Sequence, residues 1–147
     1  MNEQQSASYG ILLLRVSLGI MYLAHSLILK WATYTLDGTG QFFESIGLPY
    51  HLVYPVFAAE AVGGILLVLG VQSRWVALGL VPILIGAVWV HAGNGWVFSA
   101  ANGGWEYPLY LIVLSIAQAL LGDGAWALRP SWFPGTGRRN MMGALAR

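Results

Sequence analysis

Residues 50–71 read YHLVYPVFAAEAVGGILLVLGV, a mainly apolar run that Glu60 interrupts near its middle. A helix needs roughly 20 such residues to cross the hydrocarbon core of a membrane. Three further runs meet this requirement, and they cover residues 9–31, 75–96 and 107–128. The sequence therefore predicts an all-α integral membrane protein, a four-helix bundle with four spans.

The composition of the chain agrees with a membrane protein. Of its 147 residues, 57% are hydrophobic and 9% are charged, whereas a soluble domain usually carries about a quarter charged residues. So few charges cannot cover a water-facing surface. The net charge of +1 gives no indication of a nucleic-acid partner. Because the chain has no cysteine, disulfide and thiolate chemistry are excluded, and electron transfer would need a bound cofactor.

The segments outside the four runs differ in character. Between the first two runs, residues 41–46 carry apolar side chains that can share one helical face, which predicts a short interfacial helix. Residues 1–128 are expected to form the transmembrane domain. Residues 129–147 are basic and rich in proline and glycine, and we expect them to form a flexible cytoplasmic tail.

The distribution of positive charge predicts the orientation in the membrane. With four spans, both termini and the turn near Gln72 share one side of the bilayer. The arginines on that side are Arg74, Arg129, Arg138, Arg139 and Arg147. The loops of the other side offer only Lys30. The positive-inside rule then places both termini in the cytoplasm, in a multi-pass protein of the bacterial inner (plasma) membrane.

Several ionisable side chains lie inside the predicted spans or at their mouths, among them Arg15, His25, Glu60, His91 and Glu106. Such residues are costly in lipid and indicate a functional site by default. At a rise of about 1.5 Å per residue, His25 lies roughly 25 Å from the cytoplasmic start of its span, and Glu60 roughly 15 Å below the outer face. We therefore expect His25, Glu60 and His91 to line one polar cavity in the outer half of the bundle, with Glu106 at its rim.

Each of these residues also has a purely structural interpretation. Arg15 could neutralise a carboxylate or extend to the headgroups, and His25 could be a neutral core histidine bonded to a backbone carbonyl. His91 could cap a helix end, and Glu106 could be favoured by the macrodipole at a helix N-terminus. Glu60 is harder to explain in this way, because a carboxylate near the midplane must be protonated, paired or bound.

Arg15 is expected to face the interior of the bundle. Tyr22 follows it by seven residues and Ser26 by eleven. At 100° per residue, Tyr22 and Ser26 each fall within about 20° of Arg15 on a helix. A polar stripe that narrow is predicted to face protein rather than lipid.

The order and spacing of these features resemble the DoxX family. The resemblance rests on LRVSLG at 14–19, AHS at 24–26, GLP at 47–49, EAVGGILLVLG at 60–70, GGWEYP at 103–108 and GDG at 122–124. It implies a four-helix integral membrane protein. Some members of the family are small subunits of a thiosulfate:quinone oxidoreductase, and others are associated with redox or stress complexes. The chain departs from the family at Ser26, where glycine is frequent, and at 124–128, where a serine-leucine-aspartate ending is common.

The first function that fits these features is a membrane redox protein that binds a quinone, alone or as a small subunit of an oxidoreductase. A quinone site needs an apolar slot and a hydrogen-bonding or proton-accepting pair. Glu60 would accept a proton and His91 would act with it in catalysis, with Tyr22 or Trp89 nearby. The residues expected to bind the quinone are His25, Arg15, Tyr22 and Glu106.

Two other functions remain open from the sequence. A metal site could form from His25, Glu60, His91 and Glu106, since two imidazoles and two carboxylates on four helices suit iron, zinc or copper. No local metal motif supports this interpretation. Alternatively, the chain is a non-catalytic assembly subunit of a membrane complex. In every case the expected partners are the lipid bilayer and either a redox partner subunit or a second copy of the chain.

Overall fold

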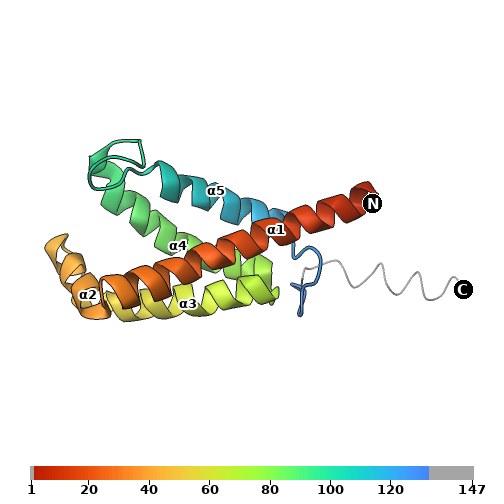
Figure 1. Cartoon of the computed structure of the whole chain (residues 1–147), viewed down its shortest axis with the longest axis horizontal. Helices are drawn as coiled ribbons and strands as arrows, with labels where there is room; N and C mark the ends of the chain where they lie inside the picture. The colour runs from red at the N-terminus through yellow and green to blue at the C-terminus, as the bar shows by residue number, and fades with distance from the viewer. Residues whose placement is uncertain (1, 133–147) are drawn as a thin grey trace, which may run out of the picture.

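The computed structural model describes residues 2–132 as an all-helical chain, and no strand occurs in that range. The elements in chain order are α1 (Glu3–Leu23), the π-helix η1 (Ala24–Thr33), α2 (Leu36–Ser45), the 3-10 helix η2 (Tyr50–Leu52), α3 (Val53–Leu69), α4 (Ser73–His91), the 3-10 helix η3 (Ala92–Asn94) and α5 (Glu106–Leu121). The long helices α1, α3, α4 and α5 form the bundle (Figure 1). The predicted fold class is confirmed.

Three helical stretches are long and apolar enough to cross a membrane: Glu3–Thr33, Tyr50–Leu69 and Ser73–Asn94. The fourth bundle helix, α5, is apolar but shorter, with 16 residues. At about 1.5 Å per residue it is roughly 24 Å long, somewhat less than a hydrocarbon core. It ends at Leu121 rather than at the expected residue 128, because Gly122 adopts a φ of 102° that a helix cannot continue.

The first helix begins earlier than the hydropathy predicts. It starts at Glu3 instead of residue 9, because Asn2 and Gln5 form a capping box. The Asn2 side chain accepts a hydrogen bond from the Gln5 backbone N–H at 2.8 Å, and the Gln5 side chain accepts one from the Asn2 N–H at 3.1 Å. Such a reciprocal cap satisfies two of the free donors at a helix start.

The interfacial helix between the first two spans is present and is longer than expected. It comprises Leu36–Ser45 rather than residues 41–46. The Thr35 hydroxyl caps its start by accepting a hydrogen bond from the Gly38 N–H at 3.1 Å. This helix lies across one end of the bundle (Figure 1).

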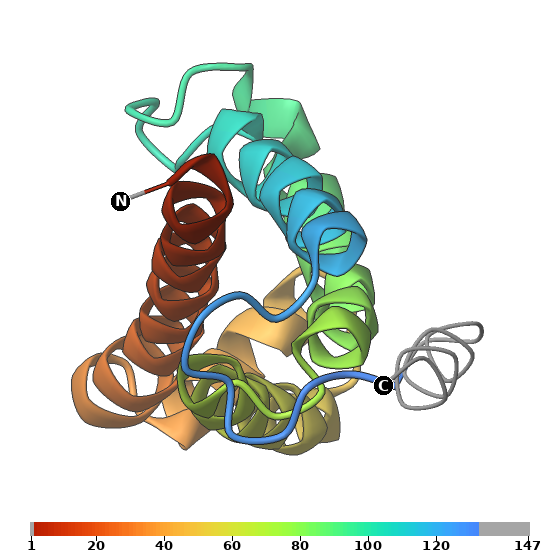
Figure 2. The ribbon, with the colours of Figure 1, turned by 90° about the vertical axis from the view of Figure 1, so that its right-hand side faces the viewer.

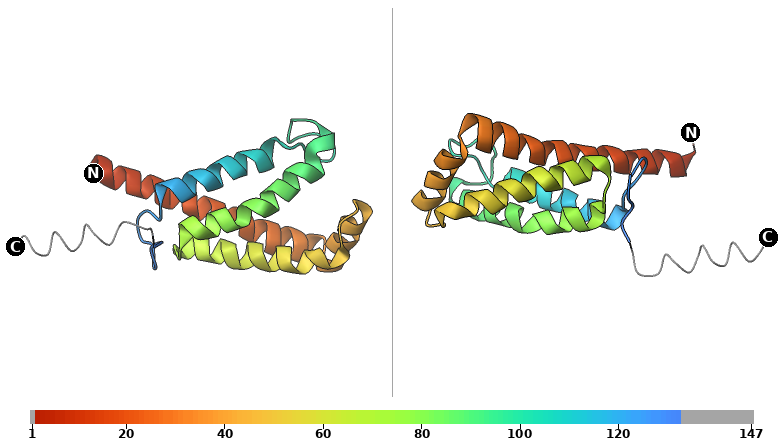
Figure 3. Two further views of the ribbon diagram at one scale, coloured as in Figure 1. Left: turned by 180° about the vertical axis from the view of Figure 1, so that it is seen from behind. Right: turned by 90° about the horizontal axis from the view of Figure 1, so that it is seen from below.

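The four bundle helices are arranged as two pairs. The helix α1 packs mainly on α3, and α4 mainly on α5. Viewed along the bundle, α4 and α5 lie together, opposite α1 (Figure 2). The α4–α5 pair diverges from α3 toward the end of the bundle where α2 lies (Figure 3). The two pairs are therefore close at one end and open at the other.

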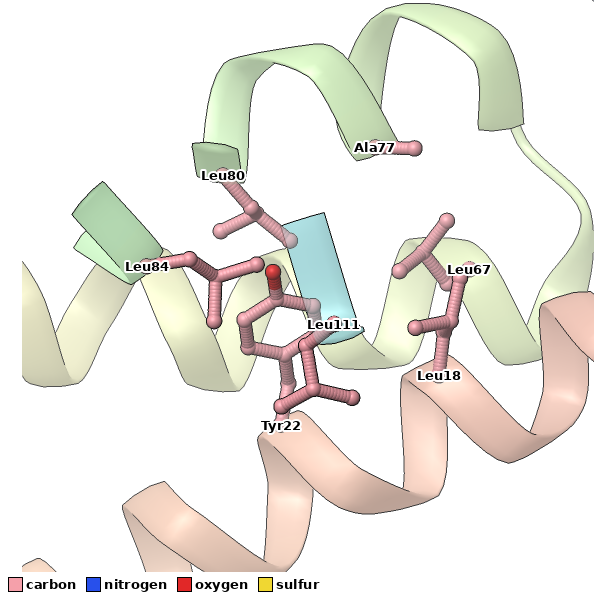
Figure 4. Packing of buried hydrophobic residues seen from close by; sticks show 7 residues of the cluster. All are labelled: Leu18, Tyr22, Leu67, Ala77, Leu80, Leu84 and Leu111. Carbon is pink, nitrogen blue, oxygen red and sulfur yellow. The ribbon is translucent and has the colours of Figure 1, made fainter. Parts of the chain in front are cut away.

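A compact apolar cluster joins the two pairs near the closed end of the bundle. Its buried members are Leu18, Tyr22, Leu67, Ala77, Leu80, Leu84 and Leu111 (Figure 4). They come from all four long helices. The cluster holds the two helix pairs together on the closed side of the point at which they separate.

Glycines allow α1 and α3 to approach closely. A Cβ atom at Gly19 would lie 2.8 Å from the Gly64 carbonyl oxygen, and one at Gly64 would lie 2.9 Å from the Gly19 carbonyl oxygen. A Cβ atom at Gly63 would meet the Leu80 side chain at 2.8 Å. Gly79 and Gly86 of α4 have no such neighbour within 4 Å.

Replacing Gly19 with alanine is expected to destabilise the bundle by about 1–3 kcal/mol, because the methyl group would push α1 away from the α3 backbone. The matched control is Gly79→Ala, where the new Cβ meets nothing within 4 Å. There the better helix propensity of alanine, about 1 kcal/mol, should leave stability unchanged or raised. Thermal unfolding in detergent measures both variants, and equal melting temperatures would contradict the close α1–α3 contact.

The segment after α5 is tied to the α3–α4 turn. The Leu128 and Arg129 N–H groups donate to the carbonyls of Leu69 and Gly70, both at 3.1 Å, and the Gln72 N–H donates to the Arg129 carbonyl at 2.9 Å. Residues 129–132 thus belong to the folded part, in contrast to the flexible tail expected from residue 129. Residues 133–147, the rest of that tail, lie outside the described residues.

Candidate functional site

A cavity of about 610 Å³ lies between the two helix pairs. It extends from Leu84, a member of the apolar cluster, to α2 and to the loop around Gly103. Most of its lining is apolar. Its ionisable or hydroxyl-bearing lining residues are Tyr22, His25, Lys30, Thr39, Glu60, His91 and Tyr107. The structure therefore brings His25, Glu60 and His91 to one cavity, as the depth argument predicts.

Glu60 is paired with Lys30 in this cavity. The Lys30 Nζ lies 3.0 Å from Oε1 and 2.8 Å from Oε2 of Glu60, so it bonds both carboxylate oxygens. The two side chains are 17% and 6% exposed. In such surroundings an unpaired carboxylate would be costly, and the ammonium group offsets that cost. The sequence analysis used Lys30 only to predict the orientation in the membrane, whereas the structure makes it the direct partner of Glu60.

The π-helix η1 explains how Lys30 reaches the cavity. Residues five apart in an α-helix point about 140° apart. In a π-helix the hydrogen bonds join residues i and i+5, as the Tyr34 N–H does with the Leu29 carbonyl at 2.8 Å. His25 and Lys30 are five residues apart, and both line the cavity. π-Helical segments are rare in proteins, and those that occur are frequently found at functional sites. No residue pattern in the sequence indicates this one.

His25 is held at the cavity by its own helix and by α5. Its Nδ1 lies 3.0 Å from the Met21 carbonyl oxygen. Its ring stacks on Tyr107, with centroids 6.3 Å apart and planes inclined by 20°. This ring contact links η1 to α5, and thus one helix pair to the other.

His91 is held by the loop that follows α4. Its Nδ1 lies 3.1 Å from the carbonyl oxygens of Asn102 and Gly103. The Asn94 side chain donates to the same two carbonyls, at 3.0 and 2.8 Å. The loop therefore orients the imidazole, and Asn94 orients the loop. Sequence reasoning missed Asn94, although it follows His91 by one helical turn.

Tyr22 contributes a polar atom to the apolar cluster. Its ring is buried between Leu80, Leu84 and Leu111, with the hydroxyl directed toward α4 (Figure 4). The residue is 1% exposed. The hydroxyl interacts with the Ser115 side chain, but neither hydroxyl makes a hydrogen bond of ordinary geometry. Tyr22 lines the cavity as well, but its hydroxyl oxygen is itself buried.

Three of the expected site residues do not line this cavity. Arg15 faces the interior as predicted, at 1% exposure, but its guanidinium donates to backbone carbonyls near the closed end. Trp89 is 59% exposed on the outer surface of α4. Glu106 is the first residue of α5, where its Oε2 accepts a hydrogen bond from the Phe98 N–H at 3.2 Å.

Glu106 lines a separate pocket of about 500 Å³ on the outside of α5. Only Phe98 and Tyr107 line both this pocket and the central cavity. Within residues 2–132, no group of three or more His, Cys, Asp or Glu side chains is placed to hold a metal ion. The structure thus does not assemble His25, Glu60, His91 and Glu106 as one ligand set.

Asp123 is an important residue that the analysis of buried charges missed. Its Oδ1 accepts hydrogen bonds from the Ser73 N–H at 3.0 Å and the Ser131 hydroxyl at 2.8 Å, and its Oδ2 accepts one from the Ser131 N–H at 2.7 Å. It therefore satisfies a free donor at the start of α4. The signal was present in the sequence, since Asp123 stands between Gly122 and Gly124.

Comparisons with known proteins identify the family of this chain. The DoxX family model matches residues 10–93, a range that includes the four cavity residues His25, Lys30, Glu60 and His91. The chain is similar to a Bacillus subtilis (strain 168) protein named "Putative oxidoreductase CatD", with 36% identity over 137 residues, 93% of this chain and 97% of that protein. No solved structure matches the chain. The chain belongs to the DoxX family.

Proposed function

We propose that this chain is a membrane redox protein that binds a quinone in the central cavity, alone or as a small subunit of an oxidoreductase. The relative from Bacillus subtilis carries the word oxidoreductase in its name. The observation that carries the proposal is the cavity itself, which combines a mainly apolar wall with two imidazoles and a buried ion pair. Its volume lies within the range of small-molecule sites.

The polar groups of the cavity supply what quinone chemistry requires of a protein. The imidazoles of His25 and His91 are hydrogen-bonding partners for the oxygens of the ring. Glu60, with Lys30 bonded to it, is a proton acceptor whose charge is already balanced. Since the chain has no cysteine, the electrons pass to a partner protein or to another bound group. Arg15 and Glu106 do not contribute to this site.

The metal alternative has less support, because the described donor groups do not converge as metal ligands do. The remaining alternative is a non-catalytic assembly subunit. A measurement of quinone binding distinguishes this alternative from the proposal, because an assembly subunit has no need to bind a quinone ring.

The proposal is tested with the purified full-length protein in detergent and a short-chain ubiquinone analogue. Isothermal titration should give a saturable site, and Glu60→Gln should weaken binding about tenfold by removing the balanced charge pair. The matched control is His51→Gln, because His51 is exposed and does not line the cavity. Absence of saturable binding to the wild-type protein would exclude the function.

We further propose that both termini face the cytoplasm of the bacterial inner membrane. The N-terminus, the α3–α4 turn and the end of α5 lie at the same end of the bundle (Figure 1). Arg74 and Arg129 also lie at that end, while Lys30 lies toward the other. A reporter fused after Arg147 should be active only in its cytoplasmic form. A periplasmic signal would reverse the orientation and place the open end of the cavity at the cytoplasm.

A further inference from the structure

The two imidazoles of the cavity are held in the same tautomer. The Nδ1 of His25 is bonded to the Met21 carbonyl, and the Nδ1 of His91 to the carbonyls of Asn102 and Gly103. A carbonyl oxygen only accepts hydrogen bonds, so Nδ1 must carry the proton in both rings. A neutral imidazole with its proton on Nδ1 has an unprotonated Nε2. Each ring therefore offers the cavity a hydrogen-bond acceptor.

The other polar groups leave little donor capacity. Lys30 directs two of its three N–H bonds to the two oxygens of Glu60. Those oxygens still have acceptor capacity, because an ionised carboxylate has about four lone-pair sites. Among the hydroxyls of the lining, that of Thr39 donates to the Thr35 carbonyl at 2.9 Å, while those of Tyr22 and Tyr107 can donate or accept. The fixed groups of the cavity are thus mainly acceptors, among them His25 Nε2 and His91 Nε2.

The two redox forms of a quinone differ in the hydrogen bonds that they make. The oxidised ring has two carbonyl oxygens, which only accept, whereas the reduced ring has two hydroxyls, which donate. A carbonyl placed against an unprotonated ring nitrogen has no hydrogen bond and loses its water. A hydroxyl in the same place donates to that nitrogen.

We propose that the cavity selects the reduced form of its ligand, a hydroquinone whose hydroxyls donate to His25 Nε2 and His91 Nε2. This rests on the proposed function, which supplies the class of ligand. Because the reduced form binds more tightly, binding raises the midpoint potential of the couple, by about 30 mV for each tenfold preference in a two-electron couple.

The experiment compares trimethylhydroquinone with trimethylquinone under anaerobic conditions, by isothermal titration into the full-length protein in detergent. We expect each hydrogen bond to contribute about tenfold, so the reduced form should bind up to about 100-fold more tightly. His25→Phe and His91→Phe should each lower this preference about tenfold. Phenylalanine keeps a ring that can stack on Tyr107. His51→Phe, outside the cavity, should keep the full preference.

The outcomes separate this inference from the proposed function. If the quinone binds as tightly as the hydroquinone or more tightly, the selection of the reduced form is wrong while the quinone site stands. The same conclusion follows if a preference survives both histidine substitutions. If neither form binds to the wild-type protein, the proposed function itself is wrong.

Discussion

Replacing Lys30 with methionine is expected to lower the stability of the protein by about 3–5 kcal/mol, one of the largest effects of any single substitution. The change removes both hydrogen bonds to the Glu60 carboxylate, at 3.0 and 2.8 Å, and leaves it 4% exposed in an apolar cavity. Breaking a buried pair by deleting one partner is strongly destabilising, because the other charge has lost its compensation. Thermal unfolding in detergent, with and without the ubiquinone analogue, measures the loss.

The double variant Lys30→Met/Glu60→Met provides the control. Replacing a whole buried ion pair with apolar residues of similar size is often neutral, so the double variant should recover most of the lost stability. It should still bind the quinone analogue about tenfold more weakly than the wild type, because the charge pair that Glu60→Gln disrupts is absent here as well. If the two substitutions were simply additive, Lys30 and Glu60 would not act as a pair.

The course of the spans could be predicted from the sequence because the membrane imposes one strong rule. Every backbone group in the hydrocarbon must be satisfied within the chain, so apolar runs of sufficient length become helices. The ends were less predictable, because local chemistry decides them. The capping box at Asn2 extends the first helix beyond its apolar run. The positive φ of Gly122 ends the last helix before its apolar run ends.

The cavity residues were predictable from the energetic cost of ionisable groups in lipid and from their depth in the membrane. Their hydrogen-bonding partners were not predictable. His25, Glu60 and His91 stand out because ionisable groups in lipid demand an explanation. Their pairing depends on the direction of each side chain, and α-helical geometry turns Lys30 away from His25. The π-helix η1 changes that direction without a recognisable residue pattern. Glu106 was misplaced for a related reason, since equal depth does not imply the same side of a helix.

Arg15 was correctly expected in the interior, but its role differs from cofactor binding. One nitrogen of its guanidinium donates to the carbonyls of Leu67 and Val68, at 3.2 and 3.4 Å, and another to the Ala125 carbonyl at 3.1 Å. The first two belong to the last turn of α3, where the Leu67 carbonyl also accepts from the Gly70 N–H at 3.2 Å. The third belongs to the segment after α5. Arg15 therefore ties α1, α3 and the chain end together, and Asp123 adds an electrostatic interaction.

Arg15→Met is accordingly expected to destabilise the protein by about 3 kcal/mol, because it leaves buried carbonyls unsatisfied, and hydrogen bonds from a charged group each contribute about 1.5–3 kcal/mol. Arg15→Lys should not rescue it, because one ammonium cannot reproduce a planar fork that reaches two separate elements. Leu13→Met, at a position of the same helix that is 69% exposed, is the control and should behave like the wild type. Hydrogen exchange locates the effect: the amides of Leu128 and Arg129, bonded to Leu69 and Gly70, should exchange faster in Arg15→Met. Unchanged protection there would show that the chain end is held without Arg15.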